Sequence, residues 1–213
     1  MPDADYTALL LVIDRSGSMS KIRDDMVGGL QNLLAAQAKL PGTLTVDIVT
    51  FDDEIEHQAV FADPATVKIQ LEPRGMTALL DALGESLEGF RSALQALPVH
   101  ARPETVQVVV VTDGHENASR RYTTVQIKRL ITDLTEEWKW DFVYLGANHD
   151  AITVGGDLGF DAGSSLTYDA QPDAVMASSE VLHRYMSDVR GKSKKEFAAG
   201  ERSRVRSENE EPS

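Results

Sequence analysis

The sequence predicts an α/β domain in which helices cover both faces of a mixed, mostly parallel central sheet. Two runs of apolar and β-branched residues, 9–13 and 105–112, are typical of strands that are buried on both faces. Segments with apolar residues three and four positions apart alternate with the strand-like runs and predict amphipathic helices. The polar residues 52–54 separate two further strand-like segments, which predicts a hairpin and therefore one antiparallel edge strand.

The individual elements follow from the same patterns in chain order. We predict strands at residues 6–13, 43–51, 55–61, 105–112, 141–145 and 164–167. We predict helices at residues 22–40, 78–94, 123–138, 148–158 and 172–189, the fourth of them broken by Gly155 and Gly156. Pro41 and Gly42 end the first helix, and Thr77 is a candidate N-cap for the second.

Length and composition indicate one domain followed by a tail. The 213 residues, of which 42% are hydrophobic, suffice for a substantial core. From Arg190 onward Lys, Arg, Glu and Ser dominate, which predicts a domain at residues 1–189 and a charged, disordered tail at residues 190–213. The tail holds seven Lys and Arg against five Glu, a net charge of +2, so the formal charge of −13 leaves −15 on the domain.

The acidic balance and the absent residue types exclude several classes of function. Nucleic acids and membrane surfaces are themselves anionic, so neither is an expected partner. The chain has no cysteine, and therefore no disulfide, thiolate nucleophile or zinc–thiolate site. No window reaches the roughly 18 apolar residues of a membrane span, and the first residues lack the basic region of a signal peptide. We therefore expect a cytoplasmic protein.

Oxygen-bearing side chains follow both of the predicted central strands. Asp14, Ser16 and Ser18 come directly after the first buried run, on a turn that Gly17 allows to bend tightly. Asp113 follows the second buried run. Because open α/β sheets bind ligands at the carboxyl ends of their strands, these oxygens predict a site for a hard cation at that edge.

Three short motifs resemble those of von Willebrand factor A domains. Residues 14–18 (DRSGS) are similar to the DxSxS motif, and residues 75–79 (GMTAL) and 112–114 (TDG) are similar to the second and third motifs of that family, in the same order. The resemblance covers residues 6–189. It implies a Rossmann-like, three-layer α/β/α fold of the intracellular bacterial or phage type, with an intact metal-ion-dependent adhesion site.

The resemblance also implies which residues hold the metal and what the metal does. Ser16, Ser18 and Thr77 would ligate it directly, and Asp14 and Asp113 would often act through water. The expected ion is Mg²⁺ or Mn²⁺, with Ca²⁺ as the third candidate. An Asp or Glu of a protein partner would complete the coordination shell, so the implied role is a non-enzymatic adaptor or scaffold. Relatives of this type often occur beside ATPase-driven assembly systems, which makes such an assembly a candidate partner.

Each candidate ligand and its neighbours also have ordinary structural interpretations. Ser16, Ser18 and Thr77 are candidate helix caps, and Asp113 is a candidate turn residue. Asp81 either accepts a hydrogen bond behind the ligands or faces solvent. Near the site, we expect a partner-selecting rim or a solvated loop at His115, Glu116 and Asn117, and help for an acidic partner from Arg15 and Arg74.

Further expectations concern residues outside the motifs. We expect a solvated turn at Asp52, Asp53 and Glu54. We expect Trp138 and Trp140 to be packing residues, and His149 and Asp150 to cap a helix.

Two other functions remain open. A metal-dependent phosphohydrolase is one, although Ser16 stands where the haloacid dehalogenase class needs a second Asp. The sequence has no G-x-S-x-G elbow for a serine hydrolase and no P-loop for phosphates. The other is a structural interaction module in which the metal only stabilises the fold.

Overall fold

The computed structural model describes residues 1–147, 150–193 and 196–206. Within these residues one sheet has the strand order β3-β2-β1-β4-β5-β6. Its strands are β1 (Asp3–Asp14), β2 (Thr43–Phe51), β3 (Ile55–Ala62), β4 (Pro103–Thr112), β5 (Asp141–Ala147) and β6 (Ser165–Tyr168). All neighbours pair in parallel except β3, which runs antiparallel to β2 at one edge. The predicted mixed sheet with an antiparallel edge strand is confirmed.

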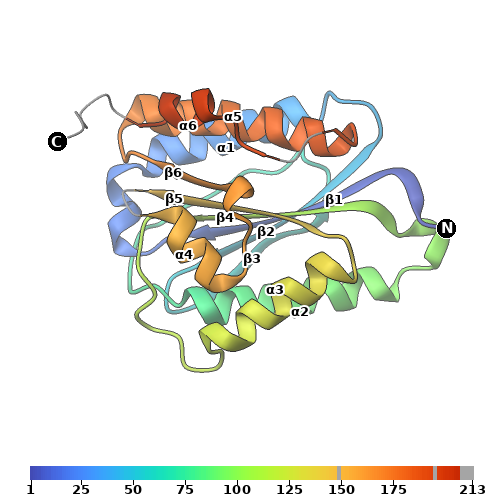
Figure 1. The fold of residues 1–213 in the computed structure, drawn as a ribbon, viewed down its shortest axis with the longest axis horizontal. Coiled ribbons are helices and arrows are strands. Elements are labelled where there is room, and N and C mark those ends of the chain that lie inside the picture. Colours follow the sequence, from blue (N-terminus) through green and yellow to red (C-terminus); the bar gives the residue numbers. More distant parts are fainter. Residues whose placement is uncertain (148–149, 194–195, 207–213) are drawn as a thin grey trace.

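Helices cover both faces of this sheet, as Figure 1 shows. One face carries α1 (Arg23–Gln37), α5 (Pro172–Arg190) and the short α6 (Ala199–Arg204). The other face carries α2 (Leu79–Ala96), α3 (Thr124–Glu136) and α4 (Ala151–Leu158). The predicted α/β/α layering is therefore confirmed. None of the described helices is both long and apolar enough to cross a lipid bilayer.

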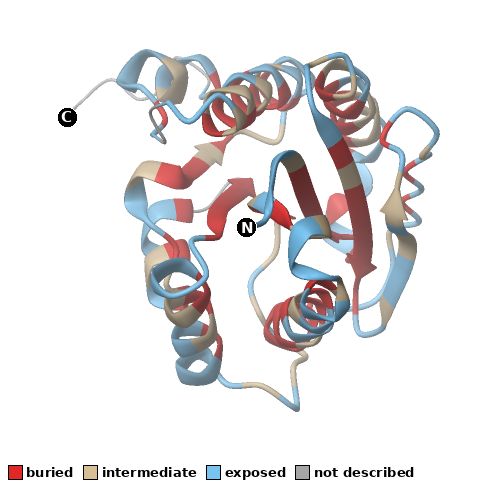
Figure 2. Cartoon of the chain, turned by 90° about the vertical axis from the view of Figure 1, so that its right-hand side faces the viewer, coloured by how far each residue is buried: buried red, intermediate tan, exposed pale blue. Residues whose placement is uncertain are grey.

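The central strand β1 supplies side chains to two core layers, one on each side of the sheet. Leu9, Leu11 and Ile13 pack in the layer beneath α1 and α5. Leu10 and Val12 pack in the layer beneath α2 and α3. Figure 2 shows the result, with buried strands between helices whose outer faces are exposed. Burying each such side chain contributes about 1.5–3 kcal/mol, so both central strands are strongly fixed in place.

The register of the central strands brings two motifs to the same edge. Ile13 of β1 is the partner of Val111 in β4, and Asp14 is the partner of Phe51 in β2. The residues that follow these positions therefore leave the sheet side by side. The sheet itself sets the spacing between the Asp14 turn and the Asp113 turn.

Some predicted helices differ from the observed ones. Helix α4 begins at Ala151, where the Asp150 side chain caps it, and continues through Gly155 and Gly156 without a break. The capping role of Asp150 is confirmed, whereas His149 lies outside the described residues. Trp140 is buried as expected, but Trp138 is 41% exposed because α3 ends at Glu136 and the chain turns before β5.

The charged segment after residue 190 also differs from the expectation in its described part. Phe197 packs on Tyr185 of α5, with ring centroids 4.8 Å apart, and Val205 is fully buried in the layer beneath α5. Helix α6 lies between these two residues. Two isolated apolar residues in a charged segment are a weak sequence signal, yet they attach this segment to the core. The division of the chain at residue 190 stays a prediction.

Candidate metal-binding site

Asp14 is the last residue of β1 and is fully buried at the carboxyl edge of the sheet. Its Oδ1 accepts a hydrogen bond from the Ser16 backbone N–H at 2.6 Å, and its Oδ2 accepts one from the Thr112 hydroxyl at 2.6 Å. Burial raises the pKa of Asp14 to about 6, although these hydrogen bonds act in the opposite direction. Thr112 is thus a part of the site that the sequence indicated only as the residue before Asp113.

Ser16 and Ser18 connect the Asp14 turn to Asp113. Their hydroxyl oxygens lie 3.1 Å apart, and the Ser18 hydroxyl donates to Asp113 Oδ1 at 2.6 Å. Neither hydroxyl caps a helix: the 3₁₀ turn Gly17–Lys21 has no side-chain cap, and neither has α1, whose N-cap is Ile22. The structure therefore contradicts the capping interpretation of these two serines.

Thr77 precedes α2 and is 3% exposed. The N-cap position belongs to Ala78 and has no side-chain cap, so the prediction of Thr77 as the cap is wrong. The first turn of α2 is instead capped by Glu116, which accepts from Leu80 N at 2.9 Å, and by Ser119, which accepts from Asp81 N at 3.0 Å. Within the described part of the chain, the Thr77 hydroxyl makes no hydrogen bond, which leaves its oxygen available to a ligand.

Gly114 shows how close Thr77 lies to Asp14. A Cβ atom at Gly114 would lie 2.8 Å from Thr77 Oγ1 and 3.4 Å from Asp14 Oδ2. The Thr77 hydroxyl and the Asp14 carboxylate therefore flank the same small backbone segment. Together with the contacts of Ser16 and Ser18, this places all five predicted ligands around the carboxyl ends of β1 and β4.

The donor set suits a hard divalent cation. It contains two carboxylates and three hydroxyls and no nitrogen or sulfur, which is the oxygen-only chemistry that Mg²⁺, Mn²⁺ and Ca²⁺ prefer. Across the described residues no cluster of three or more His, Asp or Glu side chains is placed to hold a metal. Any ion at this edge would therefore depend on the hydroxyl groups and on water.

The loop after Asp113 fastens the second motif to the third. Asn117 Oδ1 accepts from Thr77 N at 2.9 Å, and Asn117 N donates to the Thr77 carbonyl at 3.0 Å. Asn117 and Glu116 thus hold the start of α2, Glu116 half-buried and Asn117 exposed, and their part in a partner-selecting rim stays a prediction. Their roles depend on contacts across about 40 residues, which no local sequence pattern indicates. His115 is exposed, and its part in partner selection stays a prediction.

Asp81 accepts hydrogen bonds and does not face solvent, although its donors are not the candidate ligands. Its carboxylate accepts hydrogen bonds from the backbone N–H groups of Arg120, Arg121 and Tyr122 at 2.9, 2.8 and 2.9 Å. It therefore ties the end of the same loop to α2.

Arg15 and Arg74 both bind the carboxylate of Asp52. Their Nε atoms both donate to Asp52 Oδ2, at 3.1 and 2.8 Å. Asp52 is only 1% exposed, so it is not part of a solvated turn. The expectation of a solvated turn was wrong for Asp52 because strand-end position alone does not determine side-chain direction, whereas Asp53 and Glu54 are exposed as expected. Help for an acidic partner from Arg15 and Arg74 stays a prediction.

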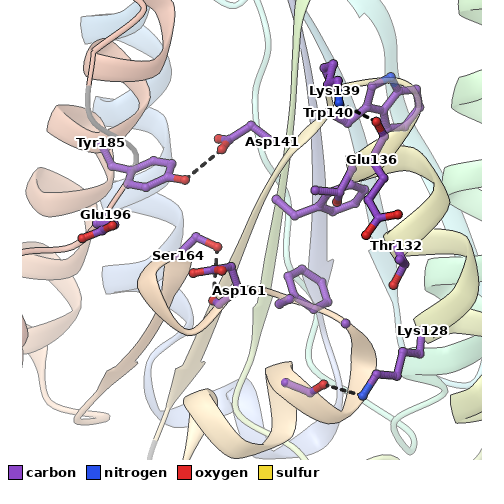
Figure 3. A pocket seen from close by; sticks show the side chains of 15 residues that line it. Lys128, Thr132, Glu136, Lys139, Trp140, Asp141, Asp161, Ser164, Tyr185 and Glu196 are labelled. Carbon is purple, nitrogen blue, oxygen red and sulfur yellow. Dashed lines mark hydrogen bonds between the residues drawn. The ribbon is translucent and has the colours of Figure 1, made fainter.

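A separate cavity of about 640 Å³ lies at the amino end of β5. Figure 3 shows Trp140, Asp141 and Tyr185 in its lining, with the Tyr185 hydroxyl donating to Asp141 Oδ1 at 2.9 Å. The candidate ligands lie at the carboxyl ends of the parallel strands, so this cavity is not part of the metal-binding site.

The fold is that of von Willebrand factor A domains. Among solved structures, proximal thread matrix protein 1 from the mussel byssus matches with a TM-score of 0.63 and 17% identity, over 86% of this chain and 46% of that one. The von Willebrand factor domain of the pilus tip protein Mfa5 from Porphyromonas gingivalis has a TM-score of 0.63 and 9% identity, over 90% and 98% of the two chains. The ArnB paralog VWA2 from Sulfolobus acidocaldarius has a TM-score of 0.56 and 19% identity, over 84% and 44%.

These identities are low enough that the similarity shows the fold alone. The chain spans less than half the length of the mussel and Sulfolobus proteins. No family model matches the sequence, and no curated protein matches it either. One structure of the mussel protein is described as having a zinc-occupied metal-ion-dependent adhesion site.

Proposed function

We propose that this chain is a metal-dependent protein-binding module whose divalent cation captures an Asp or Glu side chain of a partner. The observation that carries the proposal is the convergence of Asp14, Ser16, Ser18, Thr77 and Asp113 at one edge of the sheet. The zinc-occupied site of the mussel protein supports a divalent metal in this fold. We favour Mg²⁺ or Mn²⁺ because the donor set is entirely oxygen.

The balance of hydroxyls and carboxylates explains why the metal would favour a carboxylate partner. The two carboxylates carry a combined charge of −2, which equals but does not exceed the charge of one divalent ion. The three neutral hydroxyls donate little further electron density to the ion. When bound, the ion would supply positive charge for an incoming carboxylate. Ser16, Ser18 and Thr77 would hold it, and Asp14 and Asp113 would orient its waters. The chain carries a formal charge of −13, so an acidic partner needs such a cation to approach.

We propose binding as the role of this site, with the chain acting as a cytoplasmic adaptor or scaffold and an ATPase-linked assembly as a candidate partner. Capture of partners from a cell extract in Mg²⁺, compared with the same capture in chelator, tests the proposal. We expect a partner that is retained only with the metal and lost with Asp113→Asn. Equal capture in chelator would contradict it.

The two alternatives have their own readouts. If the metal serves only to stabilise the fold, the Thr77→Ala variant would still capture the partner, provided that the variant folds. A phosphohydrolase would release phosphate from a generic phosphomonoester, and Asp113→Ala would abolish that activity. We expect neither result.

A further inference from the structure

We propose that Asp52, which lies outside the three motifs, is a positioning residue that clamps the first two ligand loops together and thereby sets the affinity for the metal. The inference rests on the proposed function. Asp52 directly follows β2, next to the Asp14 turn in the sheet. Its role follows from the contacts of its carboxylate and of its main chain.

The Asp52 carboxylate connects two arginines from different ligand loops. Oδ2 accepts from Arg15 Nε at 3.1 Å and from Arg74 Nε at 2.8 Å. Arg15 stands between the ligands Asp14 and Ser16, and Arg74 stands three residues before the ligand Thr77. One buried carboxylate therefore joins the loop that carries two serine ligands to the loop that carries the threonine ligand.

The main chain of the same region repeats this connection. The Asp52 carbonyl accepts from Ala78 N at 2.8 Å, immediately after Thr77. Arg74 N donates to the Arg15 carbonyl at 2.9 Å, so the two loops also bond to each other directly. A shift of the Thr77 loop away from the Asp14 turn would break these bonds together with the arginine clamp.

Gly75 shows how tightly the second loop lies against the turn that begins at Asp52. Its φ is +65°, and a Cβ there would lie 2.0 Å from Asp53 Oδ1. The positive φ favours glycine here, and any side chain would also have to displace the end of the exposed Asp53 side chain. The loop before Thr77 thus lies directly against residues 52 and 53.

Charge gives Asp52 a second effect on the metal. Burial alone would raise its pKa, but the hydrogen bonds from Arg74 and from Glu54 N and the charge of Arg15 lower the pKa below its ordinary value. The ionised carboxylate offsets the positive charge of both guanidinium groups beside a cation site. A neutral side chain at this position would release the clamp and reduce this offset, although Glu56 would still pair with Arg15 and Glu54 with Arg74.

The test measures Mn²⁺ binding by calorimetry on the full chain, alongside urea unfolding of the metal-free protein. We expect Asp52→Asn to bind Mn²⁺ about tenfold more weakly, as is common when residues behind metal ligands are changed. Asp47→Asn is the matched control, since Asp47 is a buried carboxylate in the middle of β2, beside Leu10 of β1, and accepts from Phe61 N at 2.7 Å. It should leave the Mn²⁺ affinity unchanged.

A second variant covers the case in which Asp52→Asn fails to fold. The Arg74 side chain is half exposed, so Arg74→Gln should fold and still bind Mn²⁺ several-fold more weakly. Affinities equal to wild type in Arg74→Gln and in any folded Asp52→Asn would overturn the clamp while leaving the proposed function intact. A wild type that binds no Mn²⁺ would overturn both. An equal loss of affinity in Asp47→Asn would also overturn the clamp, because the effect would then not depend on the contacts of Asp52 with the two arginines.

Discussion

Ser18 donates a hydrogen bond to Asp113 at 2.6 Å, which joins the turn after β1 to the turn after β4. The two residues are 95 positions apart in the chain. Both turns leave parallel, neighbouring strands at the same edge, so the sheet determines that they meet. The contact is between a neutral hydroxyl and a carboxylate, the two kinds of oxygen that the proposed cation would bind.

Replacing Ser18 by alanine should weaken metal binding much more than it weakens the fold. Ser18 is exposed, so losing its hydrogen bond should cost about 1 kcal/mol or less of unfolding free energy. Loss of a direct ligand should lower Mn²⁺ affinity about tenfold or more. Ser20→Ala is the control, because Ser20 lies on the same turn but donates to the Gly17 carbonyl. Calorimetric titration that gives equal affinities for both variants would remove Ser18 from the ligand set.

Replacing Thr112 by valine should destabilise the metal-free protein. The Thr112 hydroxyl donates to Asp14 Oδ2 and accepts from Gly114 N at 3.1 Å, and valine has nearly the same shape without these bonds. A buried carboxylate that loses such a donor costs about 1–3 kcal/mol. Urea unfolding at neutral pH measures this difference. A change below about 0.5 kcal/mol would show that Asp14 does not depend on Thr112.

Replacing Gly114 by alanine should place a methyl group between the candidate ligands Thr77 and Asp14 and so hinder metal binding. The new methyl group would lie 2.8 Å from Thr77 Oγ1, so Thr77 or the Asp113 turn must move. We expect Mn²⁺ affinity to fall by at least about tenfold. Gly89→Ala in α2 is the control, since a Cβ there meets nothing within 4 Å, and a helical alanine should stabilise by up to about 1 kcal/mol. Unchanged Mn²⁺ binding by Gly114→Ala would contradict the proposed position of Thr77.

Asp81 should make the stability of the fold depend on pH on the acid side. Burial alone would raise its pKa, but the backbone N–H groups of residues 120–122 and the charge of Arg121, which Glu85 shares, lower it below the ordinary value. A depressed carboxyl pKa contributes stability that is complete above about pH 5 and is lost as pH falls through the lowered pKa. Asp81→Asn should therefore lower stability at neutral pH and flatten its decline toward acid. Parallel curves for the two proteins, measured by urea unfolding from neutral to acidic pH, would rule this out.

Local patterns in the sequence predicted the layers and the hairpin at the edge of the sheet, and the resemblance of three motifs to a known family implied the set of five candidate ligands. The bounds of β2 agree with the prediction because the segment is rich in β-branched residues and lies between clear turn signals, Pro41 and Gly42 before it and residues 52–54 after it. The contacts that hold the ligands in place could not be predicted in this way. Glu116 caps α2, Asn117 holds Thr77 and Asp52 binds two arginines, and each contact depends on how distant segments pack.

Calorimetric titration of the metal-free wild type with Mg²⁺ and with Mn²⁺, repeated on Asp113→Asn, tests the central claim most directly. We predict one ion bound per wild-type chain and greatly weakened binding by the variant. At about ten times its Kd, the metal should stabilise the wild type by about 1.4 kcal/mol. Absence of binding heat together with an unchanged melting temperature at millimolar Mg²⁺ and Mn²⁺ would contradict the account.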